Sequence, residues 1–161
     1  AASVLATGAR AAEGVSDAAL IKAARATPLV EVDLYADKRR ACGDARSVEQ
    51  WLRDVVGPTA KSIRWAGGTC TLTGPANTRD AGTRWCARAD ITPKAGNRTA
   101  AIEVFFEKPR AGRPGKAFAF RSLTRLKNDA NYGRSPGEFA SDWGATHVKG
   151  YKAPESDSCD D

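Results

Sequence analysis

The sequence predicts an α+β fold, in which an antiparallel meander sheet of four to six strands curls over one main helix. Two observations favour this fold. Short segments of alternating apolar and polar residues recur between residues 63 and 123, and turns rich in Gly, Pro, Asn or Asp separate them, as is typical of a meander. An amphipathic helix signal precedes them at residues 47–56. Helix and sheet each offer one apolar face, so we expect each to bury the other.

The first part of the chain predicts a short helix and a strand. Residues 1–15 are rich in alanine, and we interpret them as the remnant of a signal peptide or as a flexible arm. Ser16 has the position of an N-cap, and Pro28 ends the helix that follows. Residues 29–35 alternate and are predicted as a strand; a continued helix is the alternative, which Pro28 disfavours. A polar loop is expected over residues 36–46.

The main helix is predicted from a capping box, Ser47-Val-Glu-Gln50. In such a box the Ser hydroxyl and the Gln side chain each satisfy a backbone N–H that the helix leaves free. Gly57-Pro58 ends the helix. Apolar residues at helical spacing form its predicted core stripe: Val48, Trp51, Leu52, Val55 and Val56.

The predicted strands have an apolar inner face and a charged outer face. We expect strands at residues 61–66, 69–73, 84–91, 100–107 and 116–121, with Gly67-Gly68 as the turn between the first two. On the inner face we expect Trp85, Ile102, Val104, Phe106, Phe118 and Phe120 to be buried against the helix. On the outer face we expect a surface of mixed charge, formed by Arg84, Arg88, Asp90, Glu103, Glu107 and Arg121.

The C-terminal part predicts one further short helix. Ser135-Pro-Gly-Glu138 is a second capping box, and Phe139 and Trp143 lie one turn apart, so we expect this helix to pack on the sheet or its edge. Residues 16–152 are interpreted as a single domain and residues 153–161 as an acidic tail. A sheet curled over one helix is similar in style to cystatin-like and NTF2-like domains, and this similarity concerns architecture alone.

The cysteines predict two disulfides. Cys42, Cys70, Cys86 and Cys159 contain no CxxC pair, and the chain has one histidine, so no zinc site is predicted. We expect a Cys70–Cys86 disulfide between consecutive strands and, by elimination, Cys42–Cys159. By alternation, however, Cys70 shares a side with Leu72, and Cys86 shares a side with the arginines. Either Leu72 lies on the outer face under some cover, or Cys70 pairs elsewhere.

The cysteines and the net charge predict the compartment of the protein and the class of partner that it binds. Disulfides imply an oxidising compartment, and with the alanine-rich start they predict a periplasmic or secreted protein. The net charge of +6 is scattered along the chain, without the dense stripe or motif of a specific nucleic-acid binder. The longest apolar run falls short of the ~20 residues of a membrane span. No cofactor or metal motif is present, so the expected partner is a protein or an anionic envelope component.

We interpret the chain as a non-catalytic binding domain. Its predicted binding surface is the outer sheet face, formed by Arg84, Arg88, Glu103, Phe105 and Arg121. A binding surface of this kind needs no activated nucleophile or base, which favours it in a chain with a single histidine.

The alternative is a small secreted hydrolase that uses His147. In one form Cys42 is the nucleophile and His147 its base. In the other, Glu103, Arg121 and His147 serve as base, phosphate clamp and acid of a ribonuclease-like site. A disulfide at Cys42 would exclude the first form.

Overall fold

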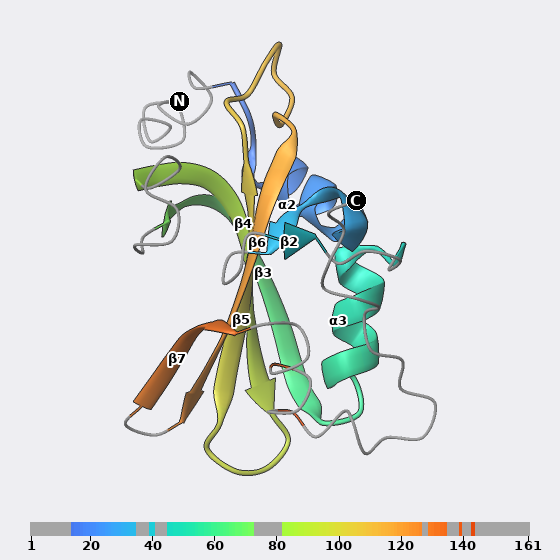
Figure 1. Cartoon of the computed structure of the whole chain (residues 1–161), viewed down its shortest axis with the longest axis vertical. Helices are drawn as coiled ribbons and strands as arrows, with labels where there is room; N and C mark the ends of the chain where they lie inside the picture. The colour runs from blue at the N-terminus through green and yellow to red at the C-terminus, as the bar shows by residue number, and fades with distance from the viewer. Residues whose placement is uncertain are drawn as a thin grey trace, which may run out of the picture.

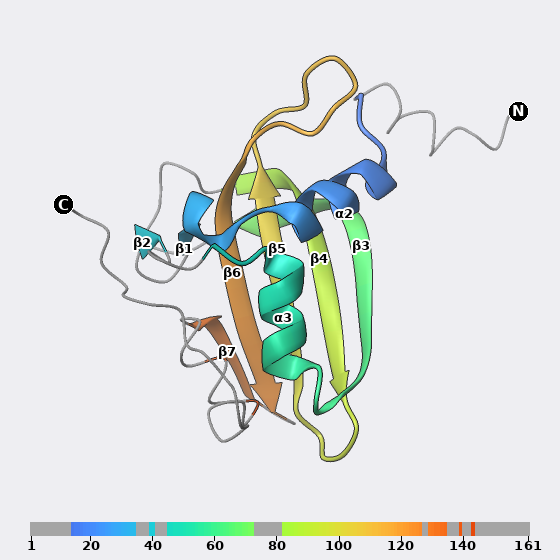
Figure 2. The ribbon, with the colours of Figure 1, turned by 90° about the vertical axis from the view of Figure 1, so that its right-hand side faces the viewer.

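The computed structural model describes residues 14–34, 39–40, 45–72, 82–126 and 129–134, together with Phe139 and Trp143. Within these residues, two α-helices, α2 and α3, lie on one face of a sheet of seven strands (Figure 2). Four long strands, β3 to β6, form the antiparallel meander in sequence order. The predicted α+β class and antiparallel sheet are therefore confirmed.

Helix α2 spans Asp17–Ala26 and begins where the sequence predicts. The hydroxyl of Ser16 accepts a hydrogen bond from the Ala19 backbone N–H at 3.1 Å, which satisfies one of the free donors of the first turn. Leu20 and Ala24, one turn apart, are buried. A short apolar stripe thus fixes this helix on the sheet.

Helix α3 spans Val48–Val56, and all five residues of its predicted stripe are buried. Half of the capping box forms, because Ser47 Oγ accepts from the Gln50 backbone N–H at 3.1 Å. The Gln50 side chain donates instead to Asp54 Oδ1 at 2.8 Å. The cap fixes the start of the helix, and the stripe fixes its orientation.

The strand predicted at residues 29–35 is wrong for most of its length. Leu29–Glu31 forms the short 3₁₀ helix η1, and only Asp33–Leu34 is extended, as β1. The backbone N–H of Val32 donates to the Leu29 carbonyl at 3.2 Å, and Leu29 and Val32 are both buried. The apolar residues follow the three-residue period of a 3₁₀ turn rather than the period of a strand.

Strand β3 spans Ala60–Leu72 without interruption. The predicted turn at Gly67-Gly68 is therefore wrong, and the two predicted strands are one. A Cβ added to Gly67 would lie 2.6 Å from the carbonyl oxygen of Asp17. Glycine is needed there because the first turn of α2 rests directly on the strand backbone, not because the chain turns.

The other long strands lie close to their predicted positions. Strands β4, β5 and β6 span Gly82–Pro93, Thr99–Phe106 and Ala117–Leu126. The far side of β6 pairs in parallel with β1 and antiparallel with β7, Asp129–Arg134, and β1 also pairs with β2, Arg39–Arg40. The sequence does not predict β2 and β7, because one has two residues and the other is mostly polar.

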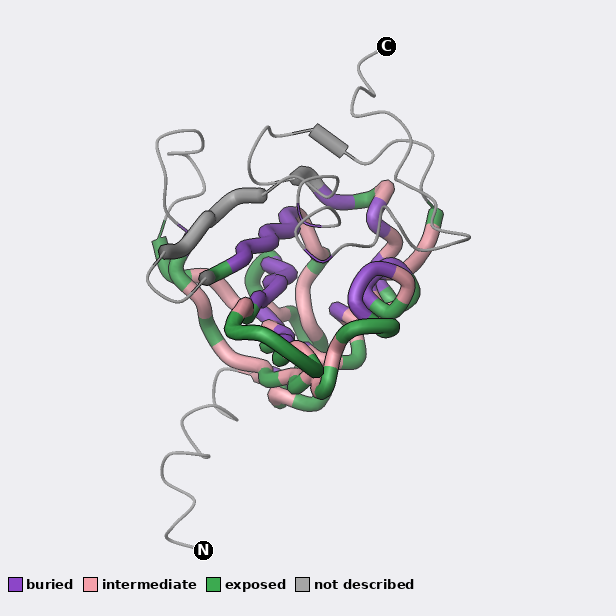
Figure 3. The backbone as a smooth tube through the Cα atoms, turned by 90° about the horizontal axis from the view of Figure 1, so that it is seen from below, coloured by how far each residue is buried: buried purple, intermediate pink, exposed green. Residues whose placement is uncertain are grey.

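The main core lies between the inner sheet face and the helices. Trp51 of α3 contacts Phe120 edge to face with ring centroids 5.5 Å apart, and it also packs on Phe139. The buried residues gather in the middle of the molecule, with exposed positions around them (Figure 3). Val15, which the sequence places in the N-terminal arm, is 3% exposed and belongs to this core. The packed part of the chain therefore begins before Ser16.

Four of the six predicted inner-face residues are buried there as expected. Ile102, Val104, Phe106 and Phe120 are buried in the main core, and Trp85 is half-buried against it. Phe118 lies instead with the outer cluster, because the pairing of β5 with β6 is irregular at this point. A bulge puts one extra residue into the strand and turns its side chain to the other face.

Candidate functional site

The outer face of the sheet is partly covered by the sheet itself. The far ends of β3 and β4 turn away from the helices (Figure 1). Arg121 Nη2 on β6 donates to the Thr71 carbonyl on β3 at 2.9 Å, although β5 and β4 lie between these strands in the sheet order. The end of β3 therefore curls back over the outer face of β5 and β6.

This curl encloses a second, smaller core, which we call the outer cluster. It consists of Leu72, Cys86, Phe105 and Ala119, all buried, with Cys70 and Phe118 packed against them. Phe105 and Phe118 have ring centroids 6.5 Å apart. An apolar residue that looks misplaced on a charged strand face, Phe105, is thus a core residue.

The predicted Cys70–Cys86 disulfide is confirmed, with the two Cα atoms 5.7 Å apart. The register pairs Gly68 with Cys86, so the cysteines lie diagonally on one face of the β3–β4 ladder. Leu72 lies on that same outer face and is fully buried, which resolves the facing conflict in favour of a covered Leu72. Cys42 and Cys159 lie outside the described residues, and their pairing stays a prediction.

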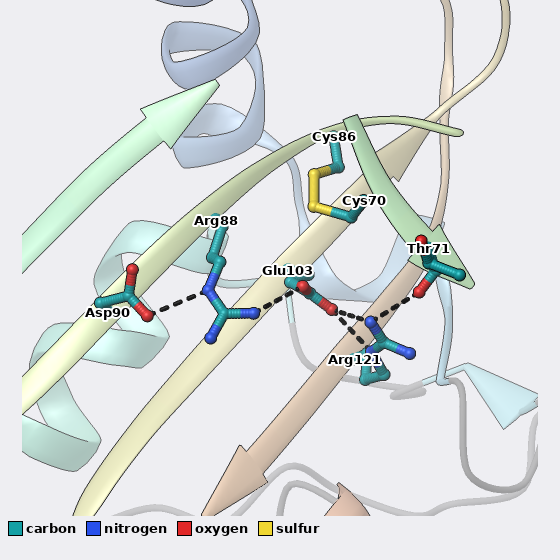
Figure 4. Close-up of a disulfide and its surroundings, with 7 residues drawn as sticks. All are labelled: Cys70, Thr71, Cys86, Arg88, Asp90, Glu103 and Arg121. Carbon is teal, nitrogen blue, oxygen red and sulfur yellow. Dashed lines mark hydrogen bonds and ion pairs between the residues drawn. A yellow bond between two sulfur atoms is a disulfide. The ribbon is translucent and has the colours of Figure 1, made fainter. Parts of the chain in front are cut away.

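A chain of ion pairs runs beside this disulfide (Figure 4). Glu103 is 3% exposed and accepts from Arg121 Nε at 2.6 Å and from Arg88 Nη1 at 2.8 Å. Arg88 Nε in turn donates to Asp90 Oδ1 at 3.0 Å. The Arg121 guanidinium also lies over the Phe105 ring, 5.3 Å from its centroid. Buried charges persist only with such partners.

Arg88 stays a cation throughout the physiological range. Partial burial acts to lower its pKa, but hydrogen bonds and charges from Asp90 and Glu103 outweigh burial and raise its pKa. The guanidinium therefore joins the buried carboxylate of Glu103 to the exposed carboxylate of Asp90.

The burial of this network changes the predicted site. Glu103, Phe105 and Arg121 were expected on an open binding surface, but they are 3%, 0% and 8% exposed. Glu103 is enclosed between the guanidinium groups of Arg88 and Arg121. These three residues hold the outer face together. Of the five predicted binding residues, only Arg84 and Arg88 reach the surface, both half-buried.

A third arginine joins these two on the surface. The register of β3 and β4 pairs Arg64 with Asp90, Ala66 with Arg88, and Cys70 with Arg84. We call Arg64, Arg84 and Arg88 the basic strip. Arg64 is exposed, and neither its side chain nor that of Arg84 has an ion-pair or hydrogen-bond partner within the described residues. Alternation with Ile63 and Trp65 in the sequence was the available signal for placing Arg64 there.

Within the described part of the chain, neither a candidate metal-binding cluster nor a candidate membrane-spanning helix is found. No group of three or more His, Cys, Asp or Glu residues lies close enough there to hold a metal ion. None of the helices described is long and apolar enough to cross a membrane. His147, on which both hydrolase interpretations depend, and Cys42, the nucleophile of one of them, lie outside the described residues.

Comparison with known proteins found no family model, no curated protein and no solved structure that matches this chain. Interpretation of the outer face therefore depends on its own residues: a disulfide, a buried ion-pair network and a basic strip.

Proposed function

We propose that the protein is an exported, non-catalytic domain that binds an anionic partner through the basic strip. The partner is a protein or an envelope component. The observation that carries this proposal is the presence of two arginines, Arg64 and Arg84, without partners among the described residues, beside a third that ion pairs hold in place. Guanidinium groups suit carboxylates and phosphates because their N–H donors match two oxygens at once.

A disulfide and ion pairs make the β3–β4 surface that carries the basic strip rigid. The Cys70–Cys86 disulfide crosses β3 and β4 between Arg84 and Arg88. Arg88 is held by Asp90 and Glu103 at 3.0 and 2.8 Å. A partner would meet a strand pair and an Arg88 side chain that need little ordering on binding, which supports affinity. Small residues on the same face of β3, Ala66 and Gly68, leave the strip accessible.

Export is supported by the Cys70–Cys86 disulfide, because disulfides persist in oxidising compartments. The expected Cys42–Cys159 disulfide would fit the same compartment. A sheet with helices on one face also resembles the cystatin-like or NTF2-like style in outline, and such scaffolds carry function in their surfaces rather than in their fold.

The test compares two charge reversals of equal size. Arg64→Glu with Arg84→Glu reverses two of the three charges of the basic strip and leaves the ion pairs of Arg88, Glu103 and Arg121 unchanged. Arg110→Glu with Arg113→Glu is the control, because both residues are exposed in the β5–β6 connection. Each pair changes the net charge by four, from +6 to +2. The probes are poly-L-glutamate and inorganic polyphosphate, measured by calorimetry at several salt concentrations.

We expect the strip variant to bind at least one probe on the order of tenfold more weakly than the control, as two exposed charge pairs imply. An equal loss in both variants would mean that net charge alone attracts the probes, and would overturn the basic strip. Binding of neither probe by the parent would overturn the anionic partner.

A further inference from the structure

Strand β3 lies at one border of the sheet that the described residues form. It is the last strand in the sheet order, so within the described residues its second edge has no partner. It forms the right-hand border of the sheet in Figure 2, where α2 crosses its upper part. The start of α2 rests on Gly67, so the open stretch is residues 60–66. The backbone N–H and C=O groups of such an edge can pair with another strand.

A groove runs beside this edge on the inner side. Its volume is about 170 Å³, and it is lined by Ile63 and Trp65 of β3, by Leu52 of α3, and by Arg25, Glu49 and Arg53. Ile63 and Trp65 are only half-buried. A cavity of ~150 Å³ can hold a benzene ring, so the groove has room for one aliphatic side chain of an added strand.

The charge of the residues at the β3 edge indicates which kind of strand could pair with it. The open stretch carries Lys61 and Arg64, both exposed, and no acidic residue. On the same face of β4 lie Arg84, Arg88 and Asp90, which is opposite Arg64 and forms an ion pair with Arg88. A second copy of this chain, paired edge to edge, would bring the same cations together, and like charges on facing strands are destabilising. An acidic strand would instead place its carboxylates beside Arg64.

We propose that the partner of the basic strip is an extended, acidic segment of another protein, which adds as a strand to residues 60–66 of β3. Its acidic side chains lie on the outer face beside Arg64, and an alternate, apolar side chain enters the groove. This inference rests on the proposed function and narrows its partner to a polypeptide. Main-chain hydrogen bonds give affinity in this mode, and alternate side chains give specificity.

The experiment uses a capped heptapeptide of alternating Glu and Val and two N-methylated forms of it. One form carries the methyl groups on the Glu amides and the other on the Val amides. Successive N–H groups of a strand point to opposite sides, so only one form loses the donors that face β3. We expect that form to bind about tenfold or more weakly than the parent peptide, while the other form binds normally.

Two further measurements complete the test. Amide hydrogen exchange, followed by NMR on the full chain, should slow within residues 60–66 on peptide binding. Arg64→Glu should weaken peptide binding, whereas Arg113→Glu, exposed in the β5–β6 connection, should not.

The outcomes separate this inference from the proposed function. If poly-L-glutamate binds through the basic strip but both methylated peptides bind like the parent, strand addition is overturned and the proposed function stands. If polyphosphate binds but neither poly-L-glutamate nor the peptide does, strand addition is overturned and the proposed function stands. If none of the three binds, the proposed function fails with it. Slowed exchange of residues 60–66 that depends on protein concentration, without peptide, would assign the edge to a second copy and overturn the proposal.

Discussion

The two faces of one sheet are buried by different means. On the inner face, α2 and α3 cover the strands, and aromatic and aliphatic side chains such as Trp51 and Phe120 fill the space. On the outer face, the curled end of β3 covers β5 and β6, and the enclosed space holds the outer cluster beside the Arg88–Glu103–Arg121 network. The inner face is stabilised mainly by apolar burial, and the outer face also by a covalent link and ion pairs.

Strand β5 shows how a strand that is buried on both faces can have the sequence pattern of a half-exposed one. Every residue from Ala100 to Phe106 is buried, so both of its faces are interior. Its alternation of Glu103 with apolar neighbours looks like that of a half-exposed strand. A carboxylate can occupy an interior face only because two guanidinium groups meet it there. Alternation therefore reports the two faces of a strand, but it does not report whether both are covered.

The largest expected effect tests the outer network. Glu103→Ala leaves Arg121 buried without its carboxylate, and we expect the free energy of unfolding to fall by about 3–5 kcal/mol. Chemical denaturation measures this loss. Asp90→Ala is the matched control, because Asp90 is exposed and pairs with the same Arg88; its loss should stay below about 1 kcal/mol.

A double replacement distinguishes charge from packing in that result. Glu103→Leu with Arg121→Leu removes both buried charges and should recover most of the stability lost in Glu103→Ala, as replaced buried ion pairs often do. Equal losses in the single and double variants would show that the side-chain volume, and not the unpaired charge, matters at this position.

The second expected effect concerns the covalent link. Replacing Cys70 and Cys86 by Ala opens a disulfide whose cysteines are 16 residues apart, and loop closure of this length is worth about 3 kcal/mol. The melting temperature should fall, and Phe105 in the outer cluster should become accessible, as hydrogen exchange of the β5 amides would report. An unchanged melting temperature would mean that the curl of β3 holds without the link.

The inner half of the fold follows closely from local patterns. The Ser16 and Ser47 caps mark the helix starts, and the stripe around Trp51 is buried as its spacing predicts. The two wrong predictions, at Gly67 and Phe118, have local causes that secondary-structure propensity does not report. Gly67 serves a close approach of two elements rather than a turn, and a single bulge moves Phe118 to the other face.

The sequence predicts on which face of the sheet the side chains of the outer site lie, but not that this face is covered. The alternation of β4 and β5 correctly places Arg88, Glu103 and Phe105 on one face. The burial of Glu103 and Phe105 depends on the end of β3, with Leu72 and Thr71, a strand that is two positions away from β5 in the sheet. That contact depends on the curl of the whole sheet, which no window of sequence reports. Exposed arginines on the same face are therefore better guides to a contact surface than buried ones.

The smallest expected effect concerns an ion pair that is open to water. Glu49 of α3 accepts from Arg25 Nη2 at 2.6 Å and from Arg53 Nη2 at 2.7 Å, and its side chain is 31% exposed. The hydrogen bond from Arg25 lowers the pKa of Glu49 below its ordinary value near 4.5; burial opposes this shift, and the charges of Arg25 and Arg53 add to it.

A depressed carboxylate pKa stabilises the fold above the unfolded value and loses that effect as pH falls through the folded value. Glu49→Gln should therefore be less stable than the parent at pH 7, by less than about 1 kcal/mol for such an exposed pair. The difference should shrink as the pH falls well below 4.5. Melting temperatures across this range measure it, with Glu31→Gln, at an exposed position, as the control. A stability difference between parent and variant that grew as the pH fell would show that Glu49 stabilises the contact between α2 and α3 as a neutral group. Glu49 would then differ from Glu103, the buried carboxylate of the outer face.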